Sequence, residues 1–216
     1  MVLQWISEHI VEIFGAVTGI LYVFLEIKRN ILLWPLGIIT SAVYILVFRD
    51  NRFYAGMVLQ GYYLVISIYG WWHWKHNTTG EIQKPAENES DGDKINKQSS
   101  DIRRLNLKSG IATSCSIIAL CFVLWYVLSR WTDSPVPLWD GLITSMSVVA
   151  TWLLTRKILE QWHIWIIANS IAVIVYLAVG MYPTAILFFV YDVMAVAGLI
   201  EWRKSFNSTR IAAEQQ

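Results

Sequence analysis

The sequence predicts an all-α membrane protein of seven transmembrane helices, arranged as two parallel three-helix repeats joined by a linker helix. The first observation behind this prediction is composition: 56% of the 216 residues are hydrophobic, only 15% are charged, and the mean hydropathy is +0.46. A soluble domain of this length does not combine so much apolar surface with so few charges. The second observation is a series of long apolar segments, and the third is an internal repeat.

Seven apolar segments have the length needed to cross about 30 Å of hydrocarbon. Strands of a membrane barrel alternate in polarity over about ten residues, whereas these segments are continuously apolar, so helices are the expected way to satisfy the backbone in lipid. Glu8 and Glu12 replace the basic residues that begin a secretory signal, so we expect the first segment to be retained as a helix. The segments span residues 10–27, 31–48, 53–74, 110–128, 138–155, 162–179 and 182–202.

Two stretches of the chain resemble each other. From Tyr54 onward the matched residues lie 128 positions apart, whereas Tyr44 and Tyr176 lie 132 apart, which a longer loop at residues 49–52 in the first copy would explain. A repeat at this spacing predicts a duplicated fold. The matched residues are Trp34, Tyr44, Tyr54, Tyr63, Gly70, Trp74 and Lys75 in the first copy, and Trp165, Tyr176, Tyr182, Tyr191, Gly198, Trp202 and Arg203 in the second.

The repeat also predicts how the helices are grouped. Three helices reverse the direction of the chain, so the additional fourth helix restores it and makes the two triplets parallel, as in SWEET transporters. Such repeats hold a substrate between the triplets, near the middle of the bilayer. The predicted parts are a first repeat at 1–75, a flexible cytoplasmic linker at 76–109, the linker helix at 110–135, a second repeat at 136–204 and a cytoplasmic tail at 205–216.

The distribution of basic residues predicts the orientation of the chain in the membrane. Of the 17 Lys and Arg residues, all except Arg49, Arg52 and Arg130 fall on one side of the predicted helices. Cytoplasmic loops carry the excess of Lys and Arg. We therefore expect the N-terminus outside and the C-terminus in the cytoplasm.

Polar residues inside the predicted helices are candidates for a substrate site, because each is costly in hydrocarbon unless it faces a cavity or a partner. Asp192 lies near the middle of the seventh helix, where it either serves a ligand or bonds to a neighbouring helix. Asn169 follows Trp162 and Trp165 at helical spacings of seven and four residues, so the three project from about the same face of the sixth helix. That face combines aromatic surface with an amide.

Several further candidates have two interpretations, since Trp and Tyr also collect at membrane interfaces. Trp152 and Trp165 either belong to such a belt or line the site, and Gln60 and Tyr63, one turn apart, either bind a hydroxylated ligand or bond to neighbouring helices. The candidate substrate-binding residues are Trp34, Gln60, Tyr63, Trp152, Trp162, Trp165, Asn169, Tyr176, Tyr191 and Asp192.

The sequence predicts no enzyme, metal or cofactor chemistry. The four histidines lie near segment ends and do not form a metal-ligand cluster. Cys115 and Cys121, within the fourth helix, have no His or acidic residue near them and are interpreted as small residues that face lipid or pack against other helices. Neither a phosphate-binding loop nor a nucleophile elbow is present.

Four runs of residues carry a resemblance to a known family. They are Trp34-Pro35-Leu36-Gly37-Ile38-Ile39 with Tyr44, Tyr69-Gly70-Trp71-Trp72-His73-Trp74, Trp152-Leu153-Leu154 followed by Arg156-Lys157, and Trp162-x-x-Trp165-x-x-x-Asn169. In their order and spacing they resemble the PnuC vitamin transporters, over nearly the whole chain outside residues 76–108. The resemblance implies a SWEET-like homotrimer that takes up nicotinamide riboside across the bacterial inner membrane by facilitated diffusion, with phosphorylation in the cytoplasm trapping the product.

Nicotinamide riboside joins a flat cationic ring to a ribose, and the candidate residues suit both parts. Tryptophan faces can stack on the ring, Asn169, Gln60 and tyrosine hydroxyls can bind the ribose, and Asp192 can balance the charge. Thiamine and riboflavin, which relatives in the family carry, remain alternatives. A seven-helix receptor is a further alternative, although the repeat argues against it, and a retinal protein would need a lysine deeper in the last helix than Lys204.

Overall fold

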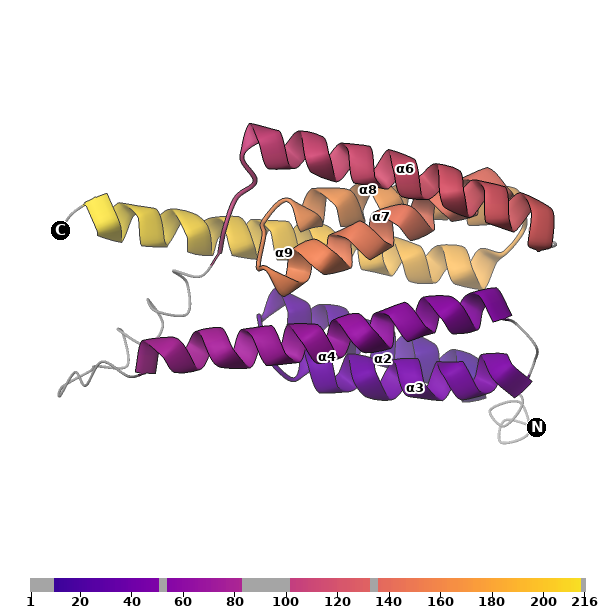
Figure 1. Ribbon diagram of the computed structural model, residues 1–216, viewed down its shortest axis with the longest axis horizontal. Helices are drawn as coiled ribbons and strands as arrows, with labels where there is room; N and C mark the ends of the chain where they lie inside the picture. Colours follow the sequence, from indigo (N-terminus) through magenta and orange to yellow (C-terminus); the bar gives the residue numbers. More distant parts are fainter. Residues whose placement is uncertain (1–9, 51–53, 83–101, 133–135, 215–216) are drawn as a thin grey trace. The chain divides into compact units, whose positions relative to one another are not determined.

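The computed structural model describes residues 10–50, 54–82, 102–132 and 136–214, and seven helices lie within these ranges (Figure 1). Each predicted apolar segment falls on one helix, although the third and seventh helices continue past the predicted ends at 74 and 202, to Ile82 and Glu214. In the described ranges the only pairing of the β type is an isolated bridge. The helices are α2 (Ile10–Ile27), α3 (Leu33–Asp50), α4 (Tyr54–Ile82), α6 (Leu107–Trp131), α7 (Pro137–Thr155), α8 (Gln161–Ala178) and α9 (Tyr182–Glu214).

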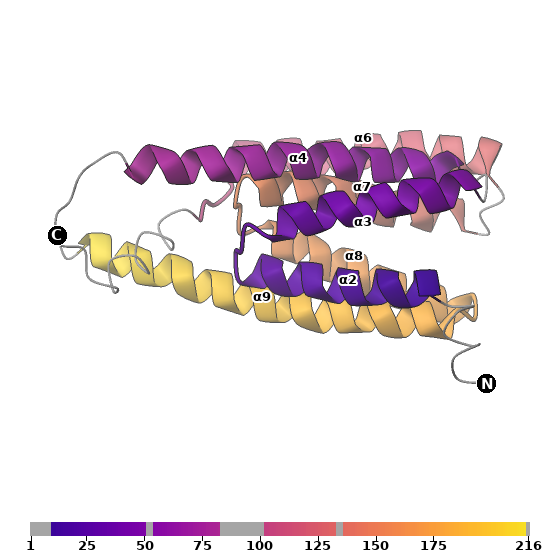
Figure 2. The same cartoon turned by 90° about the horizontal axis from the view of Figure 1, so that it is seen from below.

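The chain divides into two compact units, one within residues 1–72 and the other within residues 73–216. The first unit contains α2, α3 and most of α4. The second contains the end of α4 and helices α6 to α9, which run along a common direction in both views (Figures 1 and 2). In the second unit α6 packs on α7, α7 on α8 and α8 on α9. The predicted linker at 76–109 is described only at its two ends, since residues 83–101 lie outside the described ranges.

Length and composition make four of the described helices able to cross a membrane. They are α6, α7, α8 and the part of α9 from Tyr182 to Ser208, while α2 and α3 contain shorter apolar stretches. Helix α6 buries none of its residues, although it is rich in Leu, Ile, Val and aromatic residues. Such a surface is stable in lipid and would be a liability in water.

The loops that join α2 to α3 and α7 to α8 have the same backbone structure. Arg29 and Lys157 both have a φ angle of 53°. Arg29 N–H donates to the carbonyl three residues earlier at 3.0 Å, and Asn30 N–H donates to the carbonyl five residues earlier at 2.9 Å. Lys157 and Ile158, each 128 positions later, make the same two bonds at 2.9 and 3.1 Å. This pair of bonds ends a helix in a Schellman motif, so the two copies end their first helices in the same way.

The spacing between the two copies is constant, which corrects the residue matching made from the sequence. Helices α3 and α8 begin 128 positions apart and end 128 positions apart. Trp34 is therefore equivalent to Trp162, not to Trp165, and Tyr176 is equivalent to Phe48, not to Tyr44. No longer loop is needed in the first copy. The wrong matches arose because aromatic residues lie about one turn apart on both helices, so a shift of one turn still pairs aromatic with aromatic.

In each copy a tryptophan near the start of the second helix packs against a glycine on the third. A methyl group added to Gly70 would lie 2.5 Å from the Trp34 ring, and one added to Gly198 would lie 2.5 Å from the Trp162 ring. Both rings are almost completely buried. Only glycine lets the ring approach the backbone so closely, and this contact fixes α3 against α4 and α8 against α9.

Candidate substrate-binding site

The start of α8 carries a row of residues that are buried despite being polar or amphipathic. Gln161 is the first residue of the helix and is fully buried, Trp162 is 1% exposed, and Asn169 is 5% exposed. Trp165 lies between them and is half-buried. The structure thus keeps the predicted Trp162, Trp165 and Asn169 set on the inner side of α8 and adds Gln161 to it.

Several polar atoms near this row are buried and lack a hydrogen-bond partner among the described residues. They are Nε2 and Oε1 of Gln161, Nε1 of Trp162, Nε1 of Trp165 and Oδ1 of Asp192. Buried polar groups in proteins nearly always have partners, and each unpaired group costs about 1–3 kcal/mol. A bound polar molecule that supplies donors and acceptors here would remove these costs.

Asp192 is held by α8 through one of its two oxygens. Ser170 Oγ donates to Asp192 Oδ2 at 3.1 Å, and Ser170 directly follows Asn169 in the chain. Asp192 on α9 therefore lies beside the part of α8 that carries Asn169. Asp192 Oδ2 thus bonds to a neighbouring helix, as one of the two predictions for this residue has it. Oδ1 is buried and has no partner among the described residues, as expected of an atom that binds a ligand.

Tyr176 and Tyr191 meet through a third aromatic residue between α8 and α9. The Phe188 ring stacks on Tyr176 with centroids 5.3 Å apart, and it packs edge-on against Tyr191 at 5.9 Å. Trp162 packs edge-on against Trp202 at 5.6 Å. The Trp162 ring also packs against Gly198, so protein groups occupy its surroundings. The Trp165 ring is only half-buried and is therefore better placed to stack on a ligand.

Trp152, near the end of α7, has a different environment. Its side chain is 40% exposed, and the guanidinium carbon of Arg156 lies 4.9 Å from the centre of its ring. This is a cation–π contact next to the α7–α8 loop, which fits the membrane-interface interpretation of Trp152.

Three candidate residues, Trp34, Gln60 and Tyr63, belong to the first unit. Trp34 is fully buried against Gly70. Gln60 and Tyr63 are half-buried on α4, and the Tyr63 ring lies 5.5 Å from that of Tyr62. Their part in binding stays a prediction.

The duplicated fold provides an internal comparison for the polar residues. The first copy forms the same two helices with small or apolar side chains at the equivalent positions, so the helices do not require the polar groups of the second copy. Gln161, Trp165, Asn169 and Asp192 in the second copy are replaced by Leu33, Gly37, Ser41 and Leu64 in the first. Polar groups that packing does not require indicate a function, and those of Gln161, Trp165 and Asp192 also have buried atoms without a partner among the described residues.

Gln161 was missed by the sequence analysis because the predicted helix began one residue later, at position 162. A glutamine at a helix end is expected to reach water, so its burial could not be anticipated. The one feature of the sequence that points to Gln161 is its position directly before Trp162.

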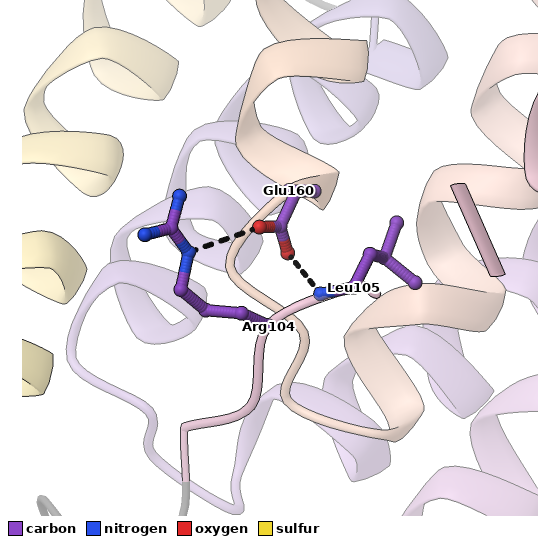
Figure 3. Close-up of polar contacts among 3 residues, drawn as sticks. All are labelled: Arg104, Leu105 and Glu160. Atoms are coloured by element: carbon purple, nitrogen blue, oxygen red, sulfur yellow. Dashed lines mark hydrogen bonds and ion pairs between the residues drawn. The ribbon is translucent and has the colours of Figure 1, made fainter. Parts of the chain in front are cut away.

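An extended segment before α6 holds the loop that leads into α8. The carboxylate of Glu160 accepts from Arg104 Nε at 3.2 Å and from Leu105 N–H at 3.0 Å, as Figure 3 shows. Arg103 pairs with the same loop through two backbone bonds, to Lys157 at 3.0 Å and from Leu159 at 2.9 Å. We call Arg104, Leu105 and Glu160 the Glu160 clamp. It fixes the residue immediately before Gln161 and thereby the start of the candidate site.

Residues 9–204 match the family model of the nicotinamide mononucleotide transporter. The chain belongs to this family. It is 26% identical over 220 residues to the nicotinamide riboside transporter PnuC of Escherichia coli (strain K12), which covers 96% of this chain and 87% of that protein. It is 21% identical over 202 residues to the riboflavin/roseoflavin transporter RibM of Streptomyces davaonensis, covering 91% of this chain and 86% of that protein.

A solved structure has a similar fold. The crystal structure of the vitamin B3 transporter PnuC matches with a TM-score of 0.69 at 21% identity, over 96% of this chain and 86% of that one. The predicted family and the predicted seven-helix fold are thus confirmed. The protein is a multi-pass membrane protein of a vitamin transporter family.

Proposed function

We propose that this protein carries nicotinamide riboside across the bacterial inner membrane by facilitated diffusion, with alternating access between two helix triplets. The observation that supports this most strongly is the group of buried polar atoms around α8 and Asp192 that lack a partner in the described parts of the chain, together with the half-buried Trp165 ring. The relatives named as nicotinamide riboside transporters support the same cargo.

The chemistry of nicotinamide riboside matches these groups one by one. Its flat pyridinium ring can stack on Trp165 and gain from the attraction between a cation and a π face. Its carboxamide and ribose hydroxyls can pair with the amides of Gln161 and Asn169. Asp192 Oδ1 provides an acceptor with negative charge, and a charged partner strengthens a hydrogen bond.

Riboflavin is the second candidate, because a relative is named for it. Its ring system is uncharged and larger than a pyridinium ring. A carboxylate in the site gives riboflavin no electrostatic advantage, so Asp192 favours the cationic cargo. Thiamine, a cation with two flat rings, is tested by the same experiments.

The repeated loop and glycine–tryptophan contacts support the 3+1+3 grouping, with the repeats at 1–75 and 136–204 and helix 110–135 between them. Parallel repeats of this kind work by rocking around a central site. The excess of basic residues on one side supports an external N-terminus and a cytoplasmic C-terminus. The homotrimer implied by the family resemblance stays a prediction.

Uptake by reconstituted protein tests the proposal. Proteoliposomes that contain the full chain should accumulate radiolabelled nicotinamide riboside only to the external concentration, with no ion gradient, and faster than empty liposomes. Internal unlabelled nicotinamide riboside should accelerate entry of the label, as a carrier with alternating access requires. Uptake of riboflavin or thiamine in its place would change the cargo, and accumulation that depends on an ion gradient would contradict facilitated diffusion.

A further inference from the structure

We propose that Glu26, Tyr22 and the two tyrosines with which Tyr22 interacts form a second binding site, within the first unit, for the positive charge of a flat organic cation. This inference rests on the proposed function, because nicotinamide riboside is such a cation. It concerns a different carboxylate from Asp192 and a different unit from the α8 site.

Glu26 is a carboxyl group enclosed by protein. It is the next to last residue of α2, its side chain is only 2% exposed, and its Oε1 atom is buried with no hydrogen-bond partner among the described residues. A carboxylate in this position is expensive, since it has lost its water and gained no counter-charge at that oxygen. Glu26 is not among the candidates predicted from the sequence, because it precedes Lys28 at the end of a predicted helix, where an acidic residue is expected to reach water.

One tyrosine interacts with this carboxyl group and connects it to two tyrosines of α4. The Tyr22 phenol, one turn before Glu26 on α2, interacts electrostatically with Glu26 and with Tyr62 and Tyr63 of α4. The Tyr62 and Tyr63 rings meet edge-on at 5.5 Å. A carboxylate together with several aromatic rings is the combination that recognises an organic cation, through charge and through the π faces. A metal ion would need several oxygen, nitrogen or sulfur ligands, and the described residues contain no cluster of three His, Cys, Asp or Glu side chains.

The second copy shows that helix packing does not require this cluster. The position equivalent to Glu26 is Leu154, which is fully buried in the corresponding helix end. The positions equivalent to Tyr22 and Tyr62 are Ala150 and Val190. The same helix, with the same terminal loop, therefore forms without the acid and without two of its tyrosines. Each copy thus has a buried polar residue at a position where the other copy has leucine, namely Glu26 in the first copy and Gln161 in the second.

The position of Glu26 suggests when the cargo meets it. In the proposed orientation, the end of α2 is the cytoplasmic end, so Glu26 would attract the cation on the inner part of its route. The carboxylate then acts on the charge of the ring, while the amides of the α8 site act on the carboxamide and the ribose.

Calorimetric titration of the purified full chain with two forms of one ligand tests the proposal. Nicotinamide riboside carries a positive ring, whereas its dihydro form has the same ribose and carboxamide on an uncharged ring. Glu26→Gln should lower the affinity for nicotinamide riboside about tenfold, the factor that corresponds to about 1.4 kcal/mol, and leave the affinity for the dihydro form unchanged. Glu26→Leu, which introduces the residue of the second copy, should do the same. Glu201→Gln removes an exposed acid of α9 and should change neither affinity.

Three results would overturn the proposal. Unchanged affinity for both forms in Glu26→Gln and Glu26→Leu would make Glu26 an acid without a ligand. An equal loss for both forms would indicate general damage and no recognition of charge. Failure of both variants to fold would make Glu26 a structural residue.

Titration with thiamine separates this inference from the proposed cargo. If the wild-type protein binds thiamine and not nicotinamide riboside, the proposed cargo is wrong, and a selective loss of thiamine binding in Glu26→Gln would still support the cation site. If it binds nicotinamide riboside and Glu26→Gln binds it equally well, only the cation site is wrong.

Discussion

Asn169 illustrates what a single residue in this fold can and cannot reveal. Its amide is polar, central in α8 and 5% exposed, and the sequence predicted its place on the same face as Trp162 and Trp165. The burial of Gln161 and Glu26 could not be predicted in the same way, because both lie at helix ends, where a polar side chain normally reaches water. Burial at a helix end depends on which neighbouring helix covers it, and one sequence does not specify that.

Replacing Asn169 by Leu should weaken binding of nicotinamide riboside by about tenfold or more, because a ligand group loses an amide partner in a buried site. The fold should persist, since α3 forms with Ser41 at the equivalent position. Calorimetric titration measures the affinity, and Ser41→Ala is the matched control, expected to bind as the wild type does. Unchanged affinity in Asn169→Leu would remove Asn169 from the site.

Replacing Gln161 by Leu should have opposite effects on stability and on binding. The variant carries the residue of the first copy, Leu33, and removes two buried amide atoms that lack partners among the described residues. We expect an equal or higher melting temperature, because an unpaired buried polar group is costly, together with weaker binding. Thermal unfolding with and without ligand measures both. A variant that is less stable yet binds normally would show that Gln161 is a packing residue.

At the scale of the helices, the length of the apolar segments predicted each element but not the alignment of the two copies. Each of the seven apolar segments forms a helix, because lipid leaves the backbone no alternative. The apolar segments do not predict the polar ends of α4 and α9, which continue to Ile82 and Glu214. The alignment required the positive φ angles of Arg29 and Lys157 and the two glycine–tryptophan contacts. These are features of the folded backbone, and basic residues are not the usual signal for a left-handed conformation.

The glycine–tryptophan contact gives a prediction that compares the two copies. Gly198→Ala places a methyl group 2.5 Å from the Trp162 ring, and Gly70→Ala does the same to Trp34. Each should destabilise the protein by about 1–3 kcal/mol, the usual cost of overpacking. Only Gly198→Ala displaces a ring that follows Gln161 directly in the chain. We therefore expect Gly198→Ala to lower the affinity for nicotinamide riboside more than Gly70→Ala does. Unfolding and binding measured on both variants check this, and equal affinity losses would contradict a site centred on α8.

The Glu160 clamp gives a prediction about the loop before α8. Glu160→Ala removes both bonds to residues 104 and 105, so amide hydrogen exchange at Leu105 should become faster. Arg104→Ala removes an ion pair whose Arg side chain is 59% exposed, and such a pair contributes less than about 1 kcal/mol. It should therefore affect exchange at Leu105 much less, since the bond from Leu105 N–H to Glu160 remains. Equal exchange rates at Leu105 in the two variants would mean that the hydrogen bond from Leu105 N–H to the Glu160 carboxylate does not hold the segment.

At the scale of the whole molecule, the sequence predicted the class of fold but not the cargo. Composition, segment length and duplication follow from the requirements of a bilayer, so they predict a seven-helix transporter. The identity of the vitamin depends on a few groups around α8 and, in our inference, around Glu26. Only the resemblance to a family, which the comparisons confirm, suggested a particular vitamin.

Calorimetric titration of the purified protein with nicotinamide riboside, riboflavin and thiamine in turn tests the proposed cargo and its site together. We expect saturable binding of nicotinamide riboside, with much weaker binding of the other two and with loss of affinity in Asn169→Leu. Tighter binding of riboflavin, or binding of nicotinamide riboside that Asn169→Leu leaves unchanged, would contradict the proposal.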